Sequence, residues 1–309
     1  MFDWNVCLLT LQQVGILFAY LAVGFCLSRT GALPKDADKT MSKLVTLLFG
    51  PAYNIANLSV SMTPERLGSN LKFVGFGFGI ILVALALAWG LSRAMGKTPL
   101  EKRSLTYGLS ITNYGYFGYP LVAGVFGQLA LQEMMVFCLS IAVITNTVGY
   151  MLFADKLSWK KIFLSPLVLA VFTGCALGVT GIQLPKAARN LLETAGNCMS
   201  PVSMILAGFV LGQMSPRELF HGARPWLQNL VSLVAIPAAF VAALYGMGCR
   251  GYYLLIPGVY MALPMGMNLV VFPASFGHDT RDNARLCLAS FLLSLVTLPI
   301  IFSILTALM

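Results

Sequence analysis

Long apolar segments separated by short polar loops constrain this chain more than any other feature of its sequence. A helix that crosses a membrane needs about 20 consecutive, mostly apolar residues. Of the 309 residues, 58 % are hydrophobic and only 10 % are charged, whereas a soluble domain typically carries about 25 % charged residues. The sequence therefore predicts an all-α integral membrane protein and excludes a soluble, disordered or disulfide-stapled fold.

Ten segments meet this length requirement, and together they account for most of the chain. The second, fourth, seventh and ninth are weak or interrupted, and the others are ordinary spans. The predicted spans run from Cys7 to Ser28, Ser42 to Met62, Leu71 to Leu91, Leu105 to Gly127, Met134 to Ala154, Ile162 to Gly181, Leu191 to Gln213, Trp226 to Met247, Tyr252 to Phe276 and Asn283 to Leu308.

The net charge of +9 is distributed in a way that predicts orientation. With ten spans, 15 of the 20 Lys and Arg residues fall in loops on one side of the membrane and only 5 on the other. Short basic loops stay in the cytoplasm, so both termini are expected outside. The N-terminus carries Asp3 and lacks the positive region of a cleaved signal peptide. The expected location is a bacterial inner membrane with periplasmic termini. The thin spread of basic residues excludes a nucleic-acid partner.

Two short motifs indicate an internal repeat. Residues 61–67 (SMTPERL) follow the second span, and residues 213–219 (QMSPREL) follow the seventh. Upstream of each motif a proline, Pro51 or Pro201, interrupts the span near its middle. Matching spans are five apart, so the second half enters the membrane from the opposite side, as in many secondary transporters. The predicted inverted repeats are residues 1–155 and 156–309.

The fourth and ninth spans carry Gly, Pro and Asn where a helix should cross the bilayer. The fourth contains Asn113 and Pro120, and the ninth contains Pro264 and Asn268. Proline inside a helix costs about 3 kcal/mol, and broken backbone at membrane depth is tolerated only inside protein or along a watery cavity. Paired breaks at corresponding positions therefore predict a transport site.

At these residues the sequence resembles the auxin efflux carrier family over essentially its whole length. Two departures lie near the expected cavity: Gly50 precedes Pro51 where members often have Asn, and Met265 follows Pro264 where Ser or Pro is common. The matching segments are residues 113–121 (NYGYFGYPL), 126–127 (FG), 263–268 (LPMGMN), 276–279 (FGHD) and 290–299.

The resemblance implies a fold similar to sodium/proton antiporters and bile-acid symporters, in which helices 4 and 9 are broken and cross. It further implies a scaffold domain from spans 1, 2, 6 and 7, and a moving transport domain from spans 3 to 5 and 8 to 10. Members form homodimers through the scaffold. Their substrates are small organic anions such as malonate, malate and, in plants, auxin.

Interrupted helices expose N-terminal N–H groups that attract anions, and Pro120 is expected as the first residue of the second half of span 4. The competing interpretations are a structural cap for Asn113, helix–helix hydrogen bonds for the other polar residues and packing for the tyrosines. The candidate substrate-binding residues are Asn113, Tyr114, Tyr116, Pro120, Asn268, Pro264, Asn54, Pro51, Ser203 and Asn146.

The predicted function is a secondary transporter that moves a small carboxylate by an elevator type of alternating access. No nucleophile with a base, acid pair or metal cluster is visible in the spans, so no enzyme activity, cofactor or metal is expected. Intramembrane Asp or Glu would mark a proton relay, and Glu133 and Asp155 lie only at span ends. A sodium-coupled symporter of the bile-acid type and a binding-only receptor remain alternatives.

Overall fold

The computed structural model describes residues 3–154, 164–215, 217, 220 and 222–309, without the side chain of Ser275. The predicted repeat boundary at residues 155 and 156, the start of the sixth span at Ile162, and Pro216 of the second motif lie outside the described residues. Every regular element that the described residues form is helical, apart from one isolated β-bridge. The all-α prediction is confirmed to this extent.

Among the residues that the structure describes, seven helical stretches are long and apolar enough to cross a membrane, and two shorter apolar helices accompany them. The α-helices are α1 (Trp4–Arg29), α2 (Ala37–Leu44), α3 (Gly50–Ser61), α4 (Leu67–Met95), α5 (Pro99–Ser110), α6 (Tyr119–Ile144), α8 (Pro166–Thr180), α9 (Lys186–Asn197), α10 (Met199–Gly212), α12 (Arg224–Leu230), α13 (Ile236–Gly246), α14 (Tyr252–Ala262), α15 (Asn268–Ser275) and α16 (Arg281–Leu308). The wider π-helical segments are η1 (Val45–Phe49), η3 (Tyr114–Gly118), η4 (Thr145–Gly149) and η5 (Val231–Ala235), and η2 (Pro64–Arg66) is a 3₁₀ turn.

The helix around Pro51 is not broken, contrary to the prediction. Helix α2, η1 and α3 follow one another without a gap from Ala37 to Ser61, with Pro51 in the first turn of α3. A π turn changes the hydrogen-bond spacing locally, and here it lies next to the residue that has no N–H. Pro201 likewise lies in the first turn of α10, after Cys198 separates that helix from α9.

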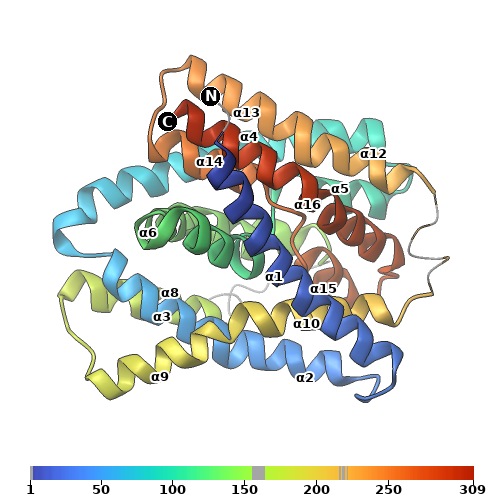
Figure 1. Cartoon of the computed structure of the whole chain (residues 1–309), viewed down its shortest axis with the longest axis horizontal. Helices are drawn as coiled ribbons and strands as arrows, with labels where there is room; N and C mark the ends of the chain where they lie inside the picture. The colour runs from blue at the N-terminus through green and yellow to red at the C-terminus, as the bar shows by residue number, and fades with distance from the viewer. Residues whose placement is uncertain (1–2, 155–163, 216, 218–219, 221) are drawn as a thin grey trace.

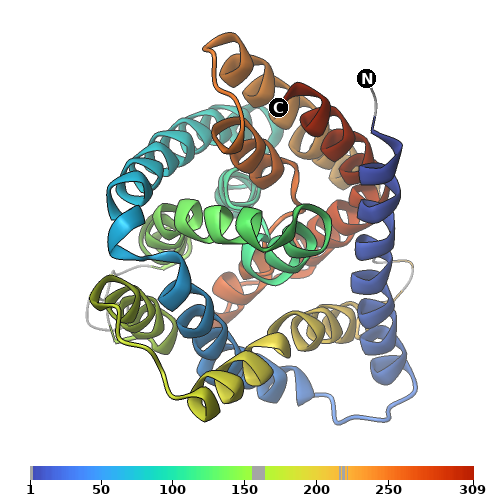
Figure 2. The ribbon, with the colours of Figure 1, turned by 60° about the vertical axis from the view of Figure 1, so that its left-hand side comes forward.

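A sharp turn divides α6 into two helical parts. Gly127 has φ +82° and ψ −179° inside this helix, a conformation that essentially only glycine adopts. Residues 114–126 and 128–149 therefore run as separate segments on either side of it. Helix α6 lies at the centre of the molecule in both views of the ribbon (Figures 1 and 2).

The remaining helices pack against one another in pairs around α6. Helix α1 packs along α10 and α16, and α3 packs against α8 and α9. Helix α4 packs against α5 and α6, while α14 contacts α13 and α16. The two ends of the chain lie at the same end of the molecule (Figure 1). There the hydroxyl of Ser303 donates a hydrogen bond to the carbonyl of Asp3 at 2.7 Å.

Helices α1 and α10 approach so closely that their contact requires glycine. A Cβ atom added to Gly24 would lie 1.9 Å from the carbonyl oxygen of Ile205, and one added to Gly208 would lie 1.9 Å from that of Leu21. Small residues let membrane helices bring their backbones together, and van der Waals packing replaces the hydrophobic effect that lipid cannot supply. This contact fixes α1 against α10 over several turns.

Candidate functional site

Two helices are interrupted in the middle of the molecule. Helix α5 ends at Ser110 and η3 begins at Tyr114, while α14 ends at Ala262 and α15 begins at Asn268. Both helices end in extended backbone, with ψ +106° at Ile111 and ψ +151° at Leu263. Leu263 precedes Pro264, and the proline ring disfavours helical backbone in the residue before it. The second break is thus encoded locally.

The two breaks pair with each other. An antiparallel β-bridge joins Thr112 to Met265. The N–H of Asn113 donates to the carbonyl of Pro264 at 2.8 Å, and the N–H of Gly266 donates to the carbonyl of Ile111 at 3.4 Å. Unpaired backbone groups at membrane depth cost several kcal/mol each. Each break therefore satisfies part of the other's backbone.

Side chains from neighbouring helices satisfy further backbone groups at the breaks. The hydroxyl of Tyr260 donates to the carbonyl of Ser110 at 2.9 Å. The N–H of Met265 donates to Oγ of Ser290 on α16 at 2.8 Å, and both residues are fully buried. Ser290 thus acts as the backbone partner of the second break.

Replacing Ser290 by alanine is expected to destabilise the site, because it leaves the buried N–H of Met265 without an acceptor. An unsatisfied buried donor costs about 1–3 kcal/mol, so the apparent melting temperature in detergent should fall. Ser294→Ala is the matched control, since the Ser294 hydroxyl is equally buried on α16 but donates to the carbonyl of Phe291 in its own helix at 2.6 Å. Equal melting temperatures for the two variants would contradict this role.

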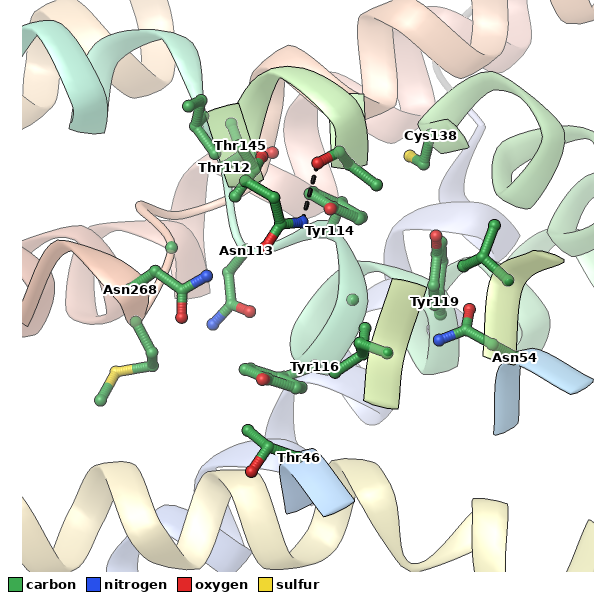
Figure 3. Close-up of a pocket in the computed structure, with 18 of the residues that line it drawn as sticks. Thr46, Asn54, Thr112, Asn113, Tyr114, Tyr116, Tyr119, Cys138, Thr145 and Asn268 are labelled. Carbon is green, nitrogen blue, oxygen red and sulfur yellow. Dashed lines mark hydrogen bonds between the residues drawn. The ribbon is translucent and has the colours of Figure 1, made fainter. Parts of the chain in front are cut away.

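A cavity of about 260 Å³ lies beside the paired breaks (Figure 3). This volume holds several water molecules or one small organic acid. Its described lining contains amide, hydroxyl and aromatic side chains but no charged one. The lining residues include Thr46, Asn54, Tyr107, Thr112, Asn113, Tyr114, Tyr116, Tyr119, Cys138, Thr145, Asn146, Met199, Asn268 and Phe272.

Hydrogen-bond donors without partners face this cavity. The side-chain nitrogen of Asn113 is buried and has no acceptor among the described residues, and this side chain does not cap η3. No described acceptor pairs with the backbone N–H groups of Tyr114, Gly115 and Tyr116 in the first turn of η3. Free N–H groups and the helix dipole make such a helix start favourable for an anion.

The other amides of the cavity are oriented differently. Asn54 donates to the carbonyl of Gly50 at 3.0 Å, and Asn146 donates to that of Ala142 at 2.8 Å, each within its own helix. Their nitrogens are thereby engaged, which leaves their oxygens as acceptors. Figure 3 shows Asn113 and Asn268 beside each other, one from each break, with Tyr116 below them. The cavity therefore offers both donors and acceptors.

The structure brings together six of the ten predicted substrate-binding residues. These six line the cavity: Asn54, Asn113, Tyr114, Tyr116, Asn146 and Asn268.

The other four lie elsewhere, each for a local reason. Pro51 starts α3, and Pro264 serves the site through its carbonyl oxygen. The Ser203 hydroxyl donates to the carbonyl of Met199 in its own helix at 2.6 Å. Pro120 was expected to begin the second half of the broken helix, but that half begins at Tyr114 with the π turn η3, and Pro120 lines a second cavity.

Several residues of the site were not predicted from the sequence. Thr46, Thr112, Thr145 and Cys138 line the cavity, and Ser290 holds the second break. Thr112 has a buried hydroxyl oxygen without a described partner, and its position directly before Asn113 was the only available signal. The others lie far from the breaks along the chain.

Comparisons with known proteins identify transporters. A family model described as membrane transport protein matches residues 9–157 and 150–302 of the chain. The chain is also similar to an uncharacterized transporter of Methanothermobacter thermautotrophicus, with 24 % identity over 291 residues. That alignment covers 90 % of this chain and 92 % of the archaeal protein.

Proposed function

Because this chain belongs to the membrane transport protein family, the auxin efflux carrier family that its sequence resembles, we propose that it is a secondary transporter of small organic anions. The chain is a multi-pass membrane transporter and not an enzyme. The proposal concerns its substrate, which we take to be a small carboxylate of the malonate or malate type, or an auxin-like acid, bound in the cavity beside the paired breaks.

The set of unpaired donors carries this proposal. The Asn113 side-chain nitrogen and the N–H groups of residues 114–116 are donors without described acceptors. A carboxylate accepts hydrogen bonds and offers none, so it fits these groups, whereas a cation would be repelled by the same dipoles. Buried polar groups are nearly always paired in native proteins. An anionic ligand is the partner that these donors lack.

The uncharged lining bears on the coupling of transport. No Lys, Arg, Asp, Glu or His is present in the described lining of the cavity, so no side-chain carboxylate there can exchange a proton for the substrate. An anion bound by neutral donors carries its own charge across the membrane. We therefore propose transport driven by the membrane potential, or by a proton carried on the substrate itself.

We propose ten crossings arranged as two inverted repeats of five. The turn at Gly127 divides η3, α6 and η4 into parts of a fourth and a fifth crossing, and α14 with α15 forms the ninth. The contacts of α1 with α10 and of α3 with α8 and α9 support a scaffold domain. The contacts of α4 with α5 and α6, and of α14 with α16, support a transport domain that moves in an elevator manner.

An even number of crossings places both termini on one side, in agreement with their common end of the molecule (Figure 1). The basic residues of the opposite loops favour a cytoplasmic position for those loops. We propose an inner-membrane protein with periplasmic termini that forms a homodimer through the scaffold domain. Exposed apolar side chains on α1, among them Leu8, Leu11 and Val23, are available for that interface or for lipid.

The proposal is tested by uptake of radiolabelled malonate, malate and indole-3-acetate into proteoliposomes. We expect saturable uptake of at least one of these anions, stimulated by an inside-positive potential, and none in protein-free liposomes. Imposed pH and sodium gradients separate the coupling modes, and a strict sodium requirement would favour the symporter alternative. Absence of flux for all three anions under every gradient would refute the carboxylate proposal and favour another substrate or a receptor that only binds.

A further inference from the structure

A second cavity, of about 590 Å³, adjoins the first one at Met199, which lines both. Its polar lining includes Asn57, Gln128, Gln132, Asn197 and the ion pair of Arg189 with Glu193. These residues lie near the ends of helices that join the sparsely charged loops, whereas Thr46 and Asn146 of the first cavity lie toward the basic loops. We call the first the inner cavity and the second the outer cavity.

The two cavities adjoin each other along three helices, α3, α6 and α10. Met199 lines both. Adjacent residues of α3 divide between them, since Asn54 lines the inner cavity and Tyr53 the outer one. Tyr119 and Pro120 divide in the same way at the start of α6. The boundary between the two cavities is therefore formed by α3, the start of α6 and the start of α10.

Two tyrosine rings stack at this boundary. The rings of Tyr53 and Tyr119 lie 5.8 Å apart between centroids, with 10° between their planes. Tyr119 is only 6 % exposed. Helix α9 holds Tyr53 from the other side, because a Cβ atom on Gly196 would lie 2.8 Å from the Cα of Tyr53. The stack joins α3, in the proposed scaffold domain, to α6, in the proposed transport domain.

A hydrogen bond joins the same two domains beside the stack. The hydroxyl of Ser200 on α10 donates to the carbonyl oxygen of Tyr116 in η3 at 2.8 Å. This carbonyl lies four residues before Pro120, which has no N–H to donate to it. The Ser200 hydroxyl thus replaces the N–H donor that Pro120 lacks. This hydrogen bond can exist only while η3 is in contact with α10.

We propose that Tyr53, Tyr119, Met199 and Ser200 form a gate that separates the two cavities, and that the outer cavity is the other end of the substrate path. The inference rests on the proposed transport function. The gate closes the inner cavity toward the outer one in this structure. Movement of the transport domain would separate the tyrosine rings and break the bond between Ser200 and Tyr116, which connects the anion site with the opposite face.

Site-directed labelling tests the gate without any substrate. Single reporter cysteines are placed at Ala142, which lines the inner cavity, and at Val60, which lines the outer one. Right-side-out and inside-out membrane vesicles are treated with a small membrane-impermeant thiol reagent. Peptide mass spectrometry separates the reporters from the seven native cysteines. We expect Ala142→Cys and Val60→Cys to react from opposite faces of the membrane.

Opening the gate should make the inner reporter accessible from both faces. Tyr53→Ala removes the ring stack, and we expect the rate of labelling of Ala142→Cys from the outer-cavity face to rise about tenfold. Ser200→Ala removes one hydrogen bond and should raise that rate about fivefold. Labelling from the inner face should remain, and a monodisperse peak in size-exclusion chromatography shows that the variants are folded.

Tyr20→Ala is the matched control, because Tyr20 lies on α1 and lines neither cavity. It should leave both labelling rates unchanged. The gate is refuted if both reporters react from the same face, or if Tyr53→Ala and Ser200→Ala label like the Tyr20 control. Because labelling requires no transported anion, the gate and the choice of substrate can fail separately.

Discussion

Replacing Asn113 by alanine is expected to raise the half-saturating concentration of the proposed anionic substrate roughly 10- to 100-fold. A hydrogen bond to a charged group contributes about 1.5–3 kcal/mol, and each 1.4 kcal/mol corresponds to a factor of ten. Asn113→Asp should be more severe, because it places a negative charge against the carboxylate. Concentration-dependent uptake into proteoliposomes measures both effects.

The same substitution should leave the empty protein as stable as before, or slightly more stable. The Asn113 side-chain nitrogen has no described partner, so alanine removes a buried, unpaired donor and breaks no hydrogen bond. A loss of thermal stability in Asn113→Ala would instead support a structural cap. Asn190→Ala is the control, because Asn190 is exposed on α9 and lines neither cavity.

Gly24→Leu is expected to prevent assembly of the folded protein. A Cβ atom at this position would lie 1.9 Å from the backbone oxygen of Ile205, and backbone cannot move aside as a flexible side chain can. Ordinary overpacking costs about 1–3 kcal/mol. In Gly24→Leu, α1 and α10 must separate along their whole contact. The free energy of unfolding should therefore fall by more than about 4 kcal/mol, which is a large part of the total stability of a typical protein.

Size-exclusion chromatography and thermal unfolding of the purified protein measure this loss. Gly15→Leu is the matched control on the same helix, because an added Cβ atom at Gly15 meets nothing within 4 Å. We expect a monodisperse peak for Gly15→Leu and aggregate or no protein for Gly24→Leu. Similar behaviour of the two variants would show that the close contact of α1 and α10 is not needed for folding.

Local rules were sufficient to predict the breaks. Pro264 restricts Leu263 to extended backbone, and Asn113 followed by a glycine-rich stretch indicated the other interruption. Both breaks appear where the sequence predicted them, and Asn113 and Asn268 both line the inner cavity. The all-α fold class could also be predicted directly, because the apolar segments are long and carry few charged residues.

Tertiary partners could not be predicted in this way. Prolines in this chain leave carbonyl groups without donors, and side chains from distant segments supply them. Ser200 donates to Tyr116, four residues before Pro120, and Asn283 donates to Leu269, four residues before Pro273, at 2.8 Å. The proline predicts that a carbonyl needs a partner, but only the packing of helices determines which serine or asparagine provides it.

The β-bridge between Thr112 and Met265 also constrains how the protein can change. Its two residues come from opposite halves of the chain, so neither half contains both breaks. A fragment limited to residues 3–154 would expose the N–H of Asn113 and the carbonyl of Ile111 to lipid or water. A substitution in one break therefore affects the hydrogen bonds that it makes with the other break. We therefore expect the sequences of the two breaks to vary together among relatives.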